Sequence, residues 1–162
     1  MYKEDLVNGL WNLTNSIVLV TTECDGQFNV MTSCSSTPIG DEPPIIALNI
    51  SKSRLTYELI TKSQEFAINI LSESQSDIAK ICGSYSGRNV DKFKKAHLQT
   101  KTPKIINSPL IEECVANLEC KLIKIIQYPK PIIIGEVVSS YIDYEKKPLI
   151  FFRNQMVTTN TI

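Results

Sequence analysis

The hydrophobic residues of this chain fall mainly into short runs of the kind that form β-strands. Apolar and β-branched residues dominate residues 16–22, 44–50, 65–71 and 132–141, and residues 116–122 alternate between apolar and polar positions. Asp25-Gly26 separates the first run from residues 27–33 and is a strong hairpin signal. The pattern predicts strands that are joined by tight turns, with residues 116–122 exposed on one face.

Helical patterning appears in three segments between these runs. Apolar residues on one face predict a helix over residues 3–13. Ser53 is the predicted N-cap of a second helix, because its hydroxyl can accept from a free first-turn amide. Ser72 and Gln75 form a capping-box pattern for a third helix, which we expect to end at Gly83.

The remaining segments are rich in proline, glycine or charge. Pro38 and the prolines at 43–44 predict a loop, residues 83–95 a basic loop with a short helical turn, and residues 96–110 irregular structure. Gly135 inside a strand predicts a bulge or a close approach. We expect a last short strand at residues 149–152 and a loosely held tail.

The order of these elements favours one fold class. About seven strands with two or three intervening helices predict a mainly β protein, a β-barrel with peripheral helices, rather than a doubly wound sheet. No repeat or linker divides the sequence, so residues 1–162 are predicted to form a single domain.

Composition narrows the function classes. The 17 Lys and Arg residues balance the 17 Asp and Glu residues, so no overall field favours nucleic acid or a membrane surface. No apolar run is long enough to span a bilayer and the N-terminus lacks a signal core, so we expect a cytoplasmic protein. Five irregularly spaced cysteines and one surface histidine, His97, predict no metal site.

Two polar clusters flank the apolar run at residues 44–50. The first holds Thr32, Ser33, Cys34 and Ser35, whose hydroxyls and backbone groups suit a planar heterocycle. An ordinary polar turn is the alternative for this cluster, and it is the favoured one if the cluster is taken alone.

The second cluster opens the predicted second helix. Ser51, Ser53 and Thr56 supply hydroxyls and Arg54 a guanidinium, next to the free amides of a helix N-terminus. This combination suits a phosphate group. A capped helix with solvated charges is the alternative interpretation.

Arg88 lies in the basic segment 86–93. It could pair with a phosphate or with a carboxylate of a partner chain, and a solvated loop is the alternative. The sequence contains no nucleotide-binding glycine motif, nucleophile elbow or zinc-protease motif. An enzyme with this sequence would therefore depend on a bound cofactor.

Four motifs in order resemble one known family. Residues 29–71, the segment SGRNVDKF at 86–93 and the segment IIIGEVVSSYIDYEKKPLIFF at 132–152 are similar to the flavin reductase-like, FMN-binding split-barrel family. The resemblance covers roughly residues 12–153. It departs from the family at residues 128–131, which lack the histidine that many relatives carry before the GEV segment.

The resemblance implies a fold, a cofactor and a reaction. It implies an FMN-binding split β-barrel homodimer in which residues 32–35 contact the flavin rings and ribityl chain. Ser51, Ser53, Arg54 and Thr56 would hold the phosphate, and residues 86–92 would close over the flavin with Arg88 near the phosphate.

The implied activity is that of an oxidoreductase. Electrons would pass from NAD(P)H through bound flavin to flavin or another acceptor, and the sequence singles out no catalytic residue. The alternative is a non-enzymatic FMN-bound electron carrier that is reduced by a partner protein. A flavin-free dimeric scaffold is a third hypothesis.

Overall fold

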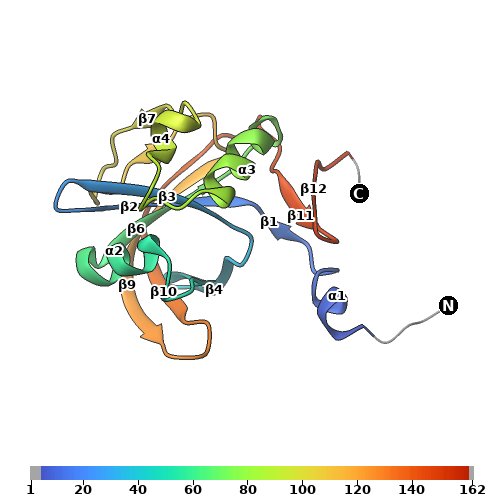
Figure 1. Cartoon of the computed structure of the whole chain (residues 1–162), viewed down its shortest axis with the longest axis horizontal. Coiled ribbons are helices and arrows are strands. Elements are labelled where there is room, and N and C mark those ends of the chain that lie inside the picture. Colours follow the sequence, from blue (N-terminus) through green and yellow to red (C-terminus); the bar gives the residue numbers. More distant parts are fainter. Residues whose placement is uncertain (1–4, 161–162) are drawn as a thin grey trace.

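A large antiparallel sheet forms the body of the protein. The computed structural model describes residues 5–160, and its seven-stranded sheet has the order β3-β2-β6-β9-β10-β5-β4 (Figure 1). The strands are β2 (Val18–Cys24), β3 (Gln27–Ser33), β4 (Thr37–Asp41), β5 (Pro44–Asn49), β6 (Glu65–Ile70), β9 (Ala116–Ile126) and β10 (Ile132–Ile142). The prediction of a mainly β fold is confirmed.

Within residues 5–160, two small sheets and four helices accompany the large sheet. The small sheets are β1 (Asn15–Ser16) with β11 (Ile150–Phe152) and β12 (Gln155–Val157), and β7 (Thr100–Lys101) with β8 (Leu110–Ile111). The helices are α1 (Leu6–Leu10), α2 (Leu55–Ser63), α3 (Ser76–Ser84) and α4 (Lys92–Lys95), and a 3₁₀ turn at Glu73–Gln75 precedes α3. No helix within residues 5–160 is long and apolar enough to cross a membrane.

The large sheet curls around an apolar interior. β2 and β5 are separated by three strands in the sheet, yet their side chains join one buried cluster with Ile60 of α2. That cluster contains Val18, Val20, Ile46, Leu48, Ile50, Ile60, Phe66, Ile68, Cys120 and Ile133. Strands so far apart can share a core only if the sheet curves toward a barrel.

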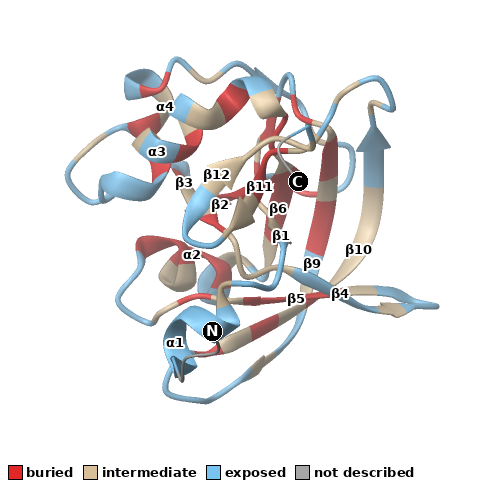
Figure 2. Cartoon of the chain, turned by 90° about the vertical axis from the view of Figure 1, so that its right-hand side faces the viewer, coloured by how far each residue is buried: buried red, intermediate tan, exposed pale blue. Residues whose placement is uncertain are grey.

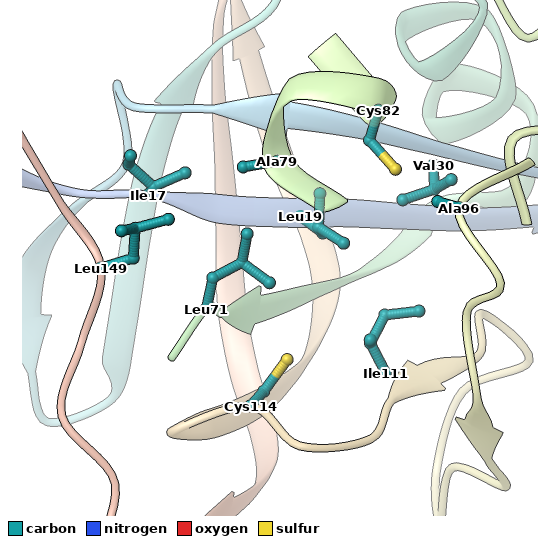
Figure 3. Packing of buried hydrophobic residues seen from close by; sticks show 10 residues of the cluster. All are labelled: Ile17, Leu19, Val30, Leu71, Ala79, Cys82, Ala96, Ile111, Cys114 and Leu149. Carbon is teal, nitrogen blue, oxygen red and sulfur yellow. The ribbon is translucent and has the colours of Figure 1, made fainter. Parts of the chain in front are cut away.

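A second cluster packs on the other face of the β2–β3 hairpin. Side chains alternate along β2, so Ile17 and Leu19 point away from the barrel interior and toward Ala79 and Cys82 of α3 (Figure 3). Figure 2 shows the hairpin covered on this side by α3 and α4, while α2 lies on the other side. The β2–β3 hairpin is therefore held between two apolar layers.

Gly135 marks the close approach that the sequence predicts. A Cβ atom at this position would lie 2.6 Å from Cζ of the fully buried Phe66 ring. The pairing of β10 with β9 shifts register between Ile134 and Gly135. The missing side chain thus lets the Phe66 ring cross β10 in the barrel interior.

Several local predictions were wrong in informative ways. Residues 37–41 form the edge strand β4 rather than a loop, which is permitted because Pro38 lies at the sheet edge and beside a register shift. Gly83 lies inside α3, which ends at Ser84. The tail is partly ordered, because β12 pairs with β11; residues 161–162 lie outside the described chain.

The ends of the first and third predicted helices also differ from expectation. α1 covers Leu6–Leu10, and residues 3–4 of the predicted helix lie outside the described chain. Its apolar residues are exposed rather than buried within this chain. The capping box is confirmed, since Ser72 and Gln75 exchange side-chain to backbone hydrogen bonds.

Two polar positions of β9, Asn117 and Glu119, are buried, contrary to the half-exposed alternation read from the sequence, whereas Lys121 is exposed as expected. The Asn117 amide donates to Asn69 Oδ1 at 2.8 Å and to the Ile111 carbonyl at 2.9 Å. The Glu119 carboxylate accepts from the backbone N–H groups of residues 104–106 at 2.8, 2.6 and 3.1 Å. Asn117 and Glu119, which lie on the same face of β9, therefore hold residues 104–106 and Ile111 against the sheet.

The charge of Glu119 should contribute to stability. Burial alone would raise the pKa of Glu119, but the three backbone donors, together with the Ser139 side chain, outweigh it and hold the pKa below its usual value. A depressed folded-state pKa stabilises the fold above the unfolded-state value and loses that contribution as the pH falls through the folded-state value.

We expect Glu119→Gln to lower the free energy of unfolding near neutral pH by about 1–3 kcal/mol, because the amide presents a donor to backbone donors. Urea unfolding at several pH values measures this. The variant should also lose less stability than the parent on acidification. Glu145→Gln, at an exposed position, is the control. Equal effects of the two changes would contradict a structural role for the Glu119 charge.

Candidate functional site

Three adjoining hollows lie along β3 and the segments that face it. We call them the apolar pocket, which Thr32 and Phe151 line, the cationic pocket, which Arg54 and Lys92 line, and the edge groove, which Phe28 and Arg88 line. The cationic pocket shares Thr32 and Gly83 with the apolar pocket, and it shares Asn29, Gly87 and Lys92 with the edge groove. They therefore form one series with the cationic pocket in the middle.

The cationic pocket is small, polar and placed at the start of α2. Its volume is about 120 Å³. Its lining residues are Asn29, Met31, Thr32, Ser53, Arg54, Leu55, Thr56, Cys82, Gly83, Tyr85, Ser86, Gly87 and Lys92. They come from β3, the first turn of α2, and the segment between α3 and α4, so three separate parts of the chain meet here.

The first turn of α2 has no side-chain cap. The prediction of Ser53 as N-cap was wrong: Arg54 holds that position and its side chain makes no capping hydrogen bond. Ser53 Oγ instead lies 3.3 Å from Ser51 Oγ, and the turn is closed by Arg54 N–H to the Ser51 carbonyl at 3.0 Å. Helix amides that no side chain satisfies can receive an anion.

Lys92 adds a buried positive charge to this pocket. Its side chain is 5% exposed, and Nζ donates to the Cys82 carbonyl at 3.1 Å. Among residues 5–160, no carboxylate forms an ion pair with it. Burial lowers the pKa of Lys92; Cys82 opposes this shift and Arg54 adds to it. An anion in the pocket would favour the charged form of Lys92 and would so oppose both the effect of burial and the repulsion from Arg54.

Asn29 and Gly87 form a closely packed part of the wall of the pocket that Lys92 also lines. The Asn29 amide donates to Thr56 Oγ1 at 2.7 Å, and both side chains are buried. The space that a Cβ at Gly87 would fill is taken by Asn29 Oδ1, which has no hydrogen-bond partner among the described residues. Only glycine fits at 87 while β3, α2 and this segment keep their contacts.

The apolar pocket lies on the other side of Thr32. Its volume is about 300 Å³. Its lining residues are Ile17, Thr32, Ser33, Cys34, Ala79, Lys80, Gly83, Ser84, Phe151 and Met156. The Thr32 hydroxyl donates to the Ala79 carbonyl at 2.6 Å, so it joins β3 to α3. What the pocket offers a ligand is therefore mainly apolar surface and backbone.

The thiol of Cys34 is half-buried in this pocket. Burial raises the pKa of Cys34, and the Lys130 charge only partly opposes the shift. Such a thiol stays protonated near neutral pH, so it contributes packing rather than a nucleophile.

Three predicted site residues lie outside these two pockets. Ser35 Oγ bridges the backbone N–H and carbonyl of Asn49, both at 3.3 Å, and so ties the end of β3 to β5. Ser51 does not line the cationic pocket. Arg88 lines the edge groove, with Nη2 3.0 Å from Glu58 Oε2. Contacts between any of these residues and a ligand stay predictions.

Sequence reasoning did not single out Lys92 or Asn29. Lys92 stands in the run KFKK, which is typical of a solvated surface, and was included only as the end of the covering loop. The sequence offers one signal, the apolar Ala96 one helical turn after Lys92, and in the structure both residues are buried.

A curved sheet that places an uncapped, cationic helix start beside an apolar pocket has the features that suit a phosphorylated, partly apolar ligand. The sequence profile named flavin reductase like domain matches residues 11–160. The chain therefore belongs to the flavin reductase-like family.

Sequence relatives bear this out. The chain is 34% identical over 131 residues to the uncharacterised protein YddH of Escherichia coli K12, over 78% of this chain and 69% of that protein. It is 27% identical to HsaB of Rhodococcus jostii RHA1, the reductase subunit of a flavin-dependent monooxygenase, over 90% and 72%. The chain spans 63%, 63% and 48% of three further uncharacterised relatives.

Solved structures share the fold. Flavoredoxin of Desulfovibrio vulgaris (Miyazaki F) superposes with a TM-score of 0.86 at 26% identity, over 98% of this chain and 93% of that one. The NADH:FAD oxidoreductase SgcE6 of Streptomyces globisporus, in complex with NAD and FAD fragments, gives 0.85 at 22% identity, over 94% and 89%. The prediction of a flavin reductase-like fold is confirmed.

The buried ammonium of Lys92 provides a test of the cationic pocket. We expect Lys92→Met to weaken the binding of added FMN by about tenfold or more, because the pocket then offers a phosphate one charged donor fewer. Quenching of flavin fluorescence measures the affinity.

A purely structural lysine would behave differently. Removing an uncompensated buried charge should leave the stability of the flavin-free protein unchanged or raised. Lys94→Met, whose side chain is 88% exposed, is the matched control on the same helix. Unchanged FMN affinity in Lys92→Met, or an equal loss in Lys94→Met, would contradict the role of Lys92.

Proposed function

We propose that this protein is an FMN-binding oxidoreductase that passes electrons from NAD(P)H through bound flavin to flavin or another acceptor. The observation that carries the proposal is the cationic pocket opening beside the apolar pocket, with Thr32 and Gly83 common to both. The riboflavin phosphate group and ring system need these two environments next to each other.

The cationic pocket fits the phosphate end of the flavin. Arg54 and Lys92 supply the charges, and the uncapped amides of α2 supply backbone donors. Ser53 is exposed at the rim, where its hydroxyl can turn toward the ligand. A dianion there would compensate the buried Lys92 charge, which no carboxylate of the described chain does.

The apolar pocket fits the flavin ring system. Thr32, Ser33 and Cys34 line one side, and Phe151 and Met156 of β11 and β12 line another. The bound flavin would supply the two-electron redox chemistry. The chain itself would hold the ring, exclude water on the apolar side and keep the polar end of β3 against the ring. This positioning requires no acid or base residue.

An electron carrier reduced by a partner protein is the second candidate function. The structural similarity to flavoredoxin and the missing histidine before residues 132–142 favour it. The similarity to a monooxygenase reductase subunit favours a reductase that hands electrons to a second protein. In either case we place the reaction in the cytoplasm, where NAD(P)H is available.

We expect the purified protein to show a flavin absorption spectrum, or to gain one on addition of FMN, and to lose it on anaerobic addition of NADH or NADPH. A bound flavin that neither nicotinamide reduces would favour the carrier. Failure to bind any flavin at micromolar concentration would contradict both functions.

We also propose that the protein works as a homodimer. The apolar residues of α1 are largely uncovered in one chain: Leu6, Val7 and Leu10 are 79%, 64% and 64% exposed. Figure 1 shows α1 standing away from the barrel, although Trp11 at its end packs edge-on against Phe151 at 5.5 Å. A second copy of the chain would bury this face.

Light scattering should therefore give the mass of a dimer, and Leu6→Ser combined with Leu10→Ser should shift it toward the monomer. Ile123→Ser changes another exposed apolar residue, 51% exposed on β9, and serves as the control. A monomeric parent protein, or dissociation by the β9 change alone, would contradict the role of α1.

A further inference from the structure

One wall of the apolar pocket lies outside the large sheet. Phe151 and Met156 form this wall, and they are direct partners across β11 and β12, so their side chains share one face of the hairpin. β11 pairs only with β12 and β1 among the described residues, and Figure 1 shows this small sheet and α1 together at one end of the molecule. The opposite wall belongs to β3 and α3, so the width of the pocket depends on where the small sheet lies.

Two side-chain contacts hold the tip of the β11–β12 hairpin against α1. The turn residues Arg153 and Asn154 both have positive φ angles, 49° and 62°, as in the two-residue turns that match the twist of paired strands. Arg153 Nε donates to Asn12 Oδ1 at 2.9 Å, and Asn154 Nδ2 donates to Asn8 Oδ1 at 3.3 Å. Both bonds are exposed, so water competes for them and each contributes little to holding the hairpin.

Trp11 makes the contact that reaches the pocket wall. Its indole ring packs edge-on against the Phe151 ring, with 5.5 Å between the ring centroids and 85° between the ring planes. The Trp11 carbonyl also accepts from the Arg153 backbone N–H at 2.7 Å. Both rings are partly buried, and an edge-on aromatic pair favours one relative orientation. While pairing with Asn15 holds the backbone of Phe151, Trp11 therefore holds its ring.

We propose that Trp11 is a positioning residue of the flavin site, which holds the Phe151 ring in the wall of the pocket that takes the flavin rings. Within the described chain, Trp11 lines none of the three hollows, so it acts through Phe151. This inference rests on the proposed flavin site. It gives the segment at the end of α1 a role in cofactor binding, although the other residues of that site come from later in the sequence.

The ring end and the phosphate end of the site can be tested separately. Riboflavin has the ring system and ribityl chain of FMN but no phosphate. Trp11→Ala acts at the ring end, so it should raise the dissociation constants for riboflavin and for FMN by the same factor. Lys92→Met acts at the phosphate end, so it should raise the dissociation constant for FMN alone. Quenching of flavin fluorescence measures both constants.

We expect the factor for Trp11→Ala to be about three- to tenfold, the scale for loss of one aromatic pair. The visible absorption bands of the bound flavin should also shift, because they respond to the groups that pack against the rings. Trp11→Phe keeps an aromatic ring beside Phe151 and should restore both the affinity and the spectrum. Tyr144→Ala removes another aromatic ring, which is 87% exposed, and as the matched control it should change neither.

Thermal unfolding of the flavin-free variants separates positioning from a purely structural role. A lower Tm for Trp11→Ala with unchanged flavin affinity and spectrum would overturn the inference, because the pocket wall would then be independent of the indole. If Trp11→Ala does not fold, Trp11→Leu takes its place, since it keeps apolar volume beside Phe151 but lacks a ring.

Three other outcomes overturn the inference in distinguishable ways. A loss of affinity for FMN but not for riboflavin would place the effect at the phosphate end. A Trp11→Phe variant as weak as Trp11→Ala would show that the aromatic contact is not the cause. Either result would keep the flavin site and remove the role of Trp11. Failure of the parent protein to bind either flavin would overturn the proposed function as well.

Discussion

A buried positive charge that no carboxylate of residues 5–160 pairs with is the constraint around which this site is built. Lys92 donates to the Cys82 carbonyl, and the pocket it lines is closed where Gly87 packs against Asn29, which in turn donates to Thr56 of α2. These contacts join β3, α2 and the segment between α3 and α4, and they keep an ammonium group and a helix start that no side chain caps in one small space. Without a ligand, the buried charge lowers the stability of the folded chain, and a bound dianion would offset this loss.

The barrel supplies the stiffness that such a site requires. β2 packs on both faces, and the irregular segment beside it is tied down by buried polar groups rather than by apolar contacts alone. Glu119 collects three backbone donors of that segment, and Asn69 and Asn117 bridge it to the sheet. Because every one of these groups is satisfied, they fix the position of the segment relative to the strands.

The sequence predicted elements whose cause is local and missed those whose cause lies in tertiary contacts. The hairpin at Asp25-Gly26, the capping box and the close approach at Gly135 follow from the conformational properties of single residues. The burial of Glu119 does not, because its partners lie 13 to 15 residues away along the chain. Lys92 looked like a surface residue for the same reason.

Because Phe151 lies near the C-terminal end of the chain, the apolar pocket cannot be completed until late in synthesis. Phe151 packs against Trp11, pairs with Asn15 and forms part of the wall of the apolar pocket. A ribosome releases residues 11–16 long before residue 151, so this wall cannot form while most of the chain is being translated. Cofactor capture should therefore be a late event in biogenesis, after the C-terminal strands have emerged and joined the N-terminal segment.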